Sequence, residues 1–303
     1  MPAHLHPNLQ PGALIGVVAL SGPAKRSRVG RGVALLRARG YRVRLGRHVF
    51  ARHGYLAGED TSRAADLNRM LHDARVDALL VARGGYGVLR LLPDVDWAAL
   101  RRRPRLLAGF SDATALFAAA RRLAGAPALH GPTATTLAEP ARYHAPSFWA
   151  GLAGRLDRLS VRIPPAQVVR HGVARGELAG GCLSLLASLA GTPFEPDLRG
   201  RILLWEDVNE EPFRIDRMLQ QLRLAGMLRG VRGVVVGKLT HCRPKGPSLG
   251  EIDLLREFFV PLGVPVVRGV RAGHCLGARS LPLGAQATLD TRRGLLSFSR
   301  PRR

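Results

Sequence analysis

Cysteine is scarce in this 303-residue chain, and long apolar runs are missing. The three cysteines, Cys182, Cys242 and Cys275, are far apart and form no CxxC pair, so neither a disulfide framework nor a zinc site is indicated. No apolar run approaches the ~20 residues that a membrane helix needs. The short apolar run at 13–20 has no Lys or Arg before it, unlike a secretory signal. We therefore expect a cytoplasmic protein with no metal and no cofactor.

Lysine and acidic residues are also few. Only three of the 46 basic residues are lysines, Asp and Glu total 22, and the formal net charge is +24. A basic stripe on one face would indicate nucleic-acid binding, but the arginines are scattered, with short clusters only at 101–105 and 300–303. Charge alone predicts non-specific attraction to anionic polymers. We therefore expect no specific nucleic-acid partner and no membrane partner.

The first half alternates apolar runs with helical patterns. Strands are predicted at 14–20, 77–82 and 106–110, and helices at 25–39 and 61–72, the second with Asp60 or Thr61 as its N-cap. This order is typical of a mostly parallel sheet with helices on both faces, and thus of an α/β fold.

The second half begins after a stretch without clear periodicity. Strands are predicted at 202–205 and 233–239 with an amphipathic helix over 213–228 between them, and 285–299 suggests a hairpin. We expect an N-terminal domain over 1–143, a linker over 144–172 and a C-terminal α/β domain over 173–303.

Ser111 stands between a strand and an alanine-rich helix, in the stretch LLAGFSDATALFAAA. It could be the helix N-cap, a role that Ser and Asp both favour. It could also be a nucleophile at the carboxyl end of a parallel sheet, where such folds place their sites. The G-x-S-x-G elbow is not satisfied, because Ala113 replaces its second glycine. The N–H of Asp112 would then be an oxyanion donor.

Three other stretches could carry chemistry. The loop in ARGGYGVLR could be a tight turn, a source of an oxyanion N–H with Gly85 as the candidate, or room for a peptide substrate; it lacks GxGxxG. Four acids in WEDVNEE could form a solvated loop and helix cap, or part of a site. His274 lies in a glycine-containing loop, where a lone histidine is usually structural. H-E-x-x-H, S-x-x-K and P-loop motifs are absent.

Together these stretches resemble the LD-carboxypeptidase (muramoyltetrapeptide carboxypeptidase) family. The motifs occur in the family's order over about residues 12–290: GYLAGEDTSRAADLNRML, ARGGYGVLRLLPDVDW, LAGFSDATALF, HGPTA, GELAGGCLSLLASLAGTPFEPD, LLWEDVNEEPFRIDRMLQQLR and GHCLGARSLPLG. The resemblance implies a serine peptidase whose nucleophile is Ser111, whose orienting acid is Glu206 and whose base is His274. It places the nucleophile in the N-terminal domain and the other two in the C-terminal domain, across a cleft.

Two residues depart from the family pattern. Cys182 stands where the family usually has Asn, which removes a side-chain amide, and Phe213 replaces a common Tyr. Among the acids, Glu206 directly follows the predicted strand, and alternation should point Asp207 to the opposite side. Glu210 is expected to cap or brace the following helix.

The resemblance implies a substrate of the murein tetrapeptide type, which loses its terminal D-alanine from an L,D bond in cell-wall recycling, and a homodimer is possible. An alternative is an immunity-type serine carboxypeptidase that cleaves a peptide–nucleotide antibiotic. A non-catalytic nucleic-acid-binding module is disfavoured, because it leaves Ser111, Glu206 and His274 unexplained.

Overall fold

A six-stranded sheet forms the centre of the first lobe. The computed structural model describes residues 7–299. The strand order is β12-β5-β4-β3-β1-β2, in which β1 to β5 are parallel and β12 runs antiparallel to β5. The apolar composition of the inner strands fits a sheet that helices cover on both faces. The bounds are β1 Leu14–Val18, β2 Arg42–Leu45, β3 Val76–Val81, β4 Leu106–Gly109, β5 Ala128–His130 and β12 Leu281–Leu283.

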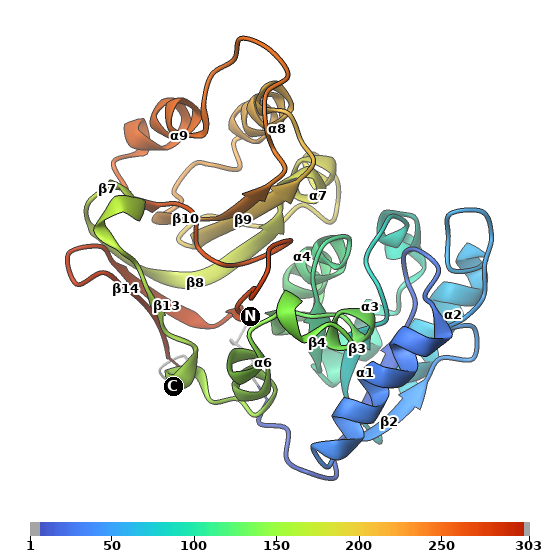
Figure 1. The fold of residues 1–303 in the computed structure, drawn as a ribbon. Coiled ribbons are helices and arrows are strands. Elements are labelled where there is room, and N and C mark those ends of the chain that lie inside the picture. Colours follow the sequence, from blue (N-terminus) through green and yellow to red (C-terminus); the bar gives the residue numbers. More distant parts are fainter. Residues whose placement is uncertain (1–6, 300–303) are drawn as a thin grey trace.

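Helices follow the strands of this sheet and pack on its faces (Figure 1). The alanine-rich helix α4 is buried along most of its length, because it packs against α3 and η1 of the first lobe and against α7 and β8 of the second. The bounds are α1 Arg26–Ala38, α2 Asp60–His72, η1 Val88–Asp94, α3 Trp97–Arg102, α4 Ala113–Ala124, α5 Ala134–Leu137, η2 Pro140–Arg142, α6 Ala145–Leu152, η3 Leu156–Leu159 and η4 Pro165–Gln167.

An eight-stranded mixed sheet forms the second lobe, with α7, α8 and α9 beside it (Figure 1). The strand order is β6-β14-β13-β8-β9-β10-β11-β7, and β8 to β11 are parallel. The bounds are β6 Val161–Arg162, β7 Val168–Arg170, β8 Val173–Cys182, α7 Leu183–Leu189, β9 Ile202–Val208, α8 Pro212–Leu224, β10 Gly233–Thr240, α9 Glu251–Phe259, η5 Val260–Leu262, β11 Val266–Val267, β13 Gln286–Asp290 and β14 Leu295–Ser299.

The predicted α/β class, the mostly parallel first sheet and the second α/β unit are confirmed. The predicted strands, helices and hairpin are present with end shifts of a few residues. The N-cap of α2 is Glu59, so the expected cap at Asp60 or Thr61 is wrong; Asp60 lies in the first turn instead. The segment 144–172 contains α6, β6 and β7. The cluster at 300–303 lies outside the described residues. None of the helices within 7–299 is long and apolar enough to cross a membrane.

Candidate active site

Ser111 occupies a strained turn between β4 and α4. Its φ is +64°, a left-handed conformation that costs a residue other than glycine about 1–3 kcal/mol. Helix α4 begins at Ala113, and its N-cap position is Asp112. Neither Ser111 nor Asp112 caps the helix with its side chain. The capping interpretation of Ser111 is therefore wrong. The backbone instead presents a partly exposed serine at the carboxyl end of a central strand, as a nucleophile elbow does.

The glycine-rich loop lies directly against Ser111. A Cβ added to Gly84 would be 3.2 Å from the Ser111 Oγ, so a side chain at this position would press on the serine. Gly85 has a φ of +128°. Within residues 7–299, neither the Gly85 N–H nor the Asp112 N–H donates a hydrogen bond. Both predicted oxyanion donors are thus free to bind a substrate oxygen.

Glu206 and His274 form a close pair across two segments of the second lobe. The His274 Nδ1 lies 2.8 Å from the Glu206 Oε2, and the His274 backbone N–H donates to the same oxygen at 3.3 Å. Glu206 is fully buried within β9, two residues before the strand ends. A Cβ on Gly273 would be 2.0 Å from the Glu206 Oε2, so a glycine is required before His274 for this contact.

The second imidazole beside Glu206 belongs to His130, which the sequence analysis did not single out. Its Nε2 lies 3.6 Å from the Glu206 Oε1, and both side chains are buried. Burial raises the pKa of Glu206, but the hydrogen bond from His274 and the charge attraction of both imidazoles outweigh burial and lower that pKa from 4.5 to about 2. The only available signal was the position of His130 in the HGPTA motif, directly at the end of β5.

The two lobes meet at this cluster. The ring of Phe110, the residue before Ser111, packs on the ring of His274 with centroids 4.9 Å apart, and it contacts His130 edge-on. A small pocket beside the cluster is lined from both halves of the chain, by Phe110 and His130 on one side and Gly273 and Arg279 on the other. The structure thus brings the Ser111 elbow and the Glu206–His274 pair to one place.

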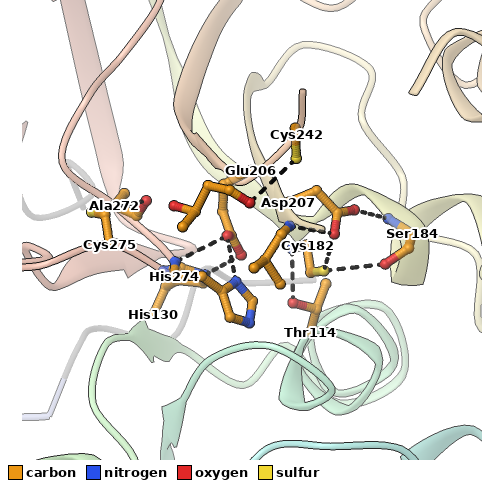
Figure 2. Close-up of polar contacts among 12 residues, drawn as sticks. Thr114, His130, Cys182, Ser184, Glu206, Asp207, Cys242, Ala272, His274 and Cys275 are labelled. Carbon is orange, nitrogen blue, oxygen red and sulfur yellow. Dashed lines mark hydrogen bonds and ion pairs between the residues drawn. The ribbon is translucent and has the colours of Figure 1, made fainter. Parts of the chain in front are cut away.

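The neighbouring acids have other partners. The Asp207 carboxylate accepts from the backbone N–H of Ser184 and of Val208, both at 2.8 Å, at the start of α7. Figure 2 shows it directed away from the two histidines, which confirms the expected alternation. The Glu210 carboxylate lies 3.8 Å from Arg214 in the first turn of α8, whose N-cap is Glu211, so Glu210 braces that helix and does not cap it.

Cys182 lies beside Glu206, since β8 and β9 pair these two residues. Its Sγ contacts the Ser184 Oγ at 3.2 Å, and its backbone N–H donates to the Thr114 Oγ1 at 3.0 Å. Burial raises the pKa of the Cys182 thiol well above its usual range, so it is not an alternative nucleophile at neutral pH. Phe213 is exposed at the start of α8.

Comparison with known proteins assigns both halves. Residues 15–131 match the LD-carboxypeptidase N-terminal domain, and residues 175–289 match the LD-carboxypeptidase C-terminal domain. The chain is 36% identical over 288 residues to the probable murein peptide carboxypeptidase of Bacillus subtilis, which covers 93% of this chain and 90% of that protein. It is 34% identical over 292 residues to the murein tetrapeptide carboxypeptidase of Pseudomonas aeruginosa, covering 92% and 94%.

Solved structures show the same fold. The muramoyltetrapeptide carboxypeptidase of Oxalobacter formigenes matches with a TM-score of 0.80 and 29% identity, covering 95% of this chain and 100% of that one. The microcin C7 self-immunity protein MccF matches in fold with a TM-score of 0.88 at 22% identity, covering 98% and 99%. With both domain matches and relatives aligned over nearly the whole chain, this protein belongs to the LD-carboxypeptidase family.

Proposed function

We propose that this protein is a serine carboxypeptidase that removes the terminal D-alanine from murein tetrapeptides, cleaving an L,D bond in cell-wall recycling. One observation carries the proposal: a buried carboxylate, Glu206, is bonded to His274 beside a strained serine at a strand-to-helix turn. The names of the relatives, murein peptide and murein tetrapeptide carboxypeptidase, support this substrate class.

In the proposed mechanism, Ser111 attacks the scissile carbonyl and His274 accepts its proton. Glu206 remains ionised at neutral pH, because its pKa is about 2. It therefore accepts a hydrogen bond from the Nδ1–H of His274, which leaves Nε2 free to take the proton from the Ser111 Oγ. The same carboxylate then stabilises the imidazolium.

The oxyanion of the tetrahedral intermediate would be held by backbone donors. The free N–H of Asp112 follows the nucleophile, and the free N–H of Gly85 lies in the loop against Ser111. Removing one such donor typically costs 10²–10³ in kcat. His274 then returns its proton to the leaving amine of D-alanine, and water hydrolyses the acyl-enzyme by the reverse sequence.

Mass spectrometry of murein tetrapeptide incubated with the protein tests this function. We expect loss of one alanine from a tetrapeptide that ends in D-alanine, and no loss from the matched peptide that ends in L-alanine. Ser111→Ala should fold normally and lose activity by about 10⁴–10⁶. Retention of more than about a tenth of wild-type activity by this variant would exclude Ser111 as the nucleophile.

Two further expectations belong to this proposal. All three cysteines are free thiols, which supports a reducing cytoplasmic location. A homodimer stays a prediction, and sedimentation of the purified protein tests it.

A further inference from the structure

The loop over residues 84–88 is packed tightly between the Ser111 turn and the backbone at Gly22. Gly84 lies against the side chain of Ser111, and a Cβ on Gly85 would be 2.9 Å from the backbone N of Gly22. The Gly22 N–H donates to the Gly84 carbonyl at 3.3 Å, a long hydrogen bond. The position of the Gly85 N–H therefore depends on what holds the far end of the loop.

The first attachment at that end is the side chain of Asp112. This carboxylate is buried, and its Oδ2 accepts from the Val88 N–H at 2.9 Å. Asp112 is also the residue after Ser111, and its own N–H is free. One residue thus supplies one of the two proposed oxyanion donors and holds the loop that carries the other.

The second attachment is Arg63 on α2, whose side chain is completely buried. Its Nη1 donates to the Gly87 carbonyl at 3.1 Å and to the Leu20 carbonyl, and its Nη2 pairs with Asp60. A buried guanidinium is costly unless its hydrogens are satisfied. Here Nη1 and Nη2 have partners, which include the loop and the chain just after β1, whereas Nε has none among the described residues. A Cβ on Gly87 would be 2.6 Å from the Arg63 Nη1, so the contact is close-packed.

We propose that Arg63 and the Asp112 carboxylate are positioning residues that fix the loop over residues 84–88 against the Ser111 turn and so set the separation of the Gly85 and Asp112 N–H groups. This inference rests on the proposed function. Oxyanion donors act at 2.7–3.1 Å from the developing charge, and a site displaced by about 1 Å loses much of its catalysis. Loosening the loop should therefore weaken transition-state stabilisation without weakening binding of the substrate.

Steady-state kinetics on D-alanine-terminated murein tetrapeptide test the inference. Asp112→Ala and Arg63→Met should each lower kcat by about 10–100-fold, less than the loss of a whole donor, with KM changed by less than about threefold. Asp112→Asn keeps an acceptor oxygen for the Val88 N–H and should recover kcat to within about fivefold of wild type. In Arg63→Met, Asp60 keeps its hydrogen bond from Arg90 at 2.8 Å, so no carboxylate is left unpaired.

Asp96→Ala is the matched control. The Asp96 carboxylate also accepts a backbone N–H, that of Ala99 at 2.8 Å, but it caps α3 and makes no contact with the loop over residues 84–88. The substitution Asp96→Ala should lower the melting temperature and leave kcat unchanged. In the Ser111→Ala background, the tetrapeptide Kd measured by calorimetry should be the same with and without the additional substitution Asp112→Ala.

The result that overturns the inference is a folded Asp112→Ala or Arg63→Met with kcat within about threefold of wild type. A loss that appears in KM or Kd instead of kcat, or an Asp112→Asn variant as slow as Asp112→Ala, overturns it equally. If Asp112→Ala does not fold, Arg63→Met decides by the same criteria. A wild-type protein that leaves the tetrapeptide intact refutes the proposed function instead, so the two failures are distinguishable.

Discussion

Replacing Glu206 by Gln removes one charge from the centre of the proposed site and little volume. The carboxylate lies 2.8 Å from the His274 Nδ1 in a fully buried position. Two unit charges about 4 Å apart attract by about 4 kcal/mol at an effective dielectric constant of 20. Since each 1.36 kcal/mol is tenfold in rate, losing the stabilisation of the imidazolium should lower kcat by about three orders of magnitude. This is within about tenfold of the ~10⁴ found for the acid of another triad.

Initial rates of D-alanine release at saturating tetrapeptide measure this loss. The matched control is Glu210→Gln, which makes the same chemical change four residues along the chain. Its carboxylate pairs with the exposed Arg214 at 3.8 Å, so Glu210→Gln should change the melting curve more than kcat. The assignment of the acid fails if Glu210→Gln shows the larger loss of kcat with an unchanged melting curve, or if Glu206→Gln stays within tenfold of wild type.

The strained turn, one buried amide and two shifted pKa values give four more tests. Ser111→Gly should be about 1 kcal/mol more stable than Ser111→Ala in urea unfolding, because glycine tolerates a φ of +64°; equal stabilities would mean that the turn is not strained. Thr114→Val leaves the buried Cys182 N–H without its acceptor and should cost about 1–3 kcal/mol of stability, with an unchanged unfolding midpoint as the contrary result. Burial raises the pKa of Cys242 to about 11, so its alkylation by iodoacetamide at pH 8 should be about 100-fold slower in the native protein than in denaturant, and comparable rates would contradict this burial. Because the pKa of Glu206 is lowered to about 2, its ionised form stabilises the fold fully above about pH 4.5 and loses this effect as the pH falls toward 2. The stability difference between wild type and Glu206→Gln should therefore be smaller at pH 3.5 than at pH 5. A larger difference at pH 3.5 would contradict the lowered pKa.

Local patterns were sufficient where an element's own sequence decides its structure. The apolar run that becomes β4, the alanine-rich α4 and the run that becomes β9 were predicted because each is bounded by clear breaks in periodicity. Alternation along β9 also separated Glu206 from Asp207 correctly, since one residue's shift reverses the side of a strand.

What the sequence did not predict depends on contacts between distant segments. His130 lies 76 positions before Glu206, and a lone histidine after a three-residue strand carries no local signal of an acidic partner. The Arg63 contacts with Leu20 and Gly87 were missed for the same reason, because an arginine on a helix is normally solvated. The Ser111 turn was ambiguous, since serine caps helices often. The two roles are distinguished by the folded backbone, which has a positive φ at Ser111 and its N-cap at Asp112.

The pairing of β12 with β5 has a consequence for how the chain folds during synthesis. Leu281–Leu283 pairs with Ala128–His130, about 150 residues earlier, and completes one edge of the first sheet. Until these residues leave the ribosome, that edge of β5 has unpaired backbone groups, which are a template for aggregation. The first lobe produced alone should therefore be prone to self-association, and purified chains truncated before residue 281 should be more sensitive to protease than chains that keep residues 281–283. The first sheet to be translated is thus among the last to be completed.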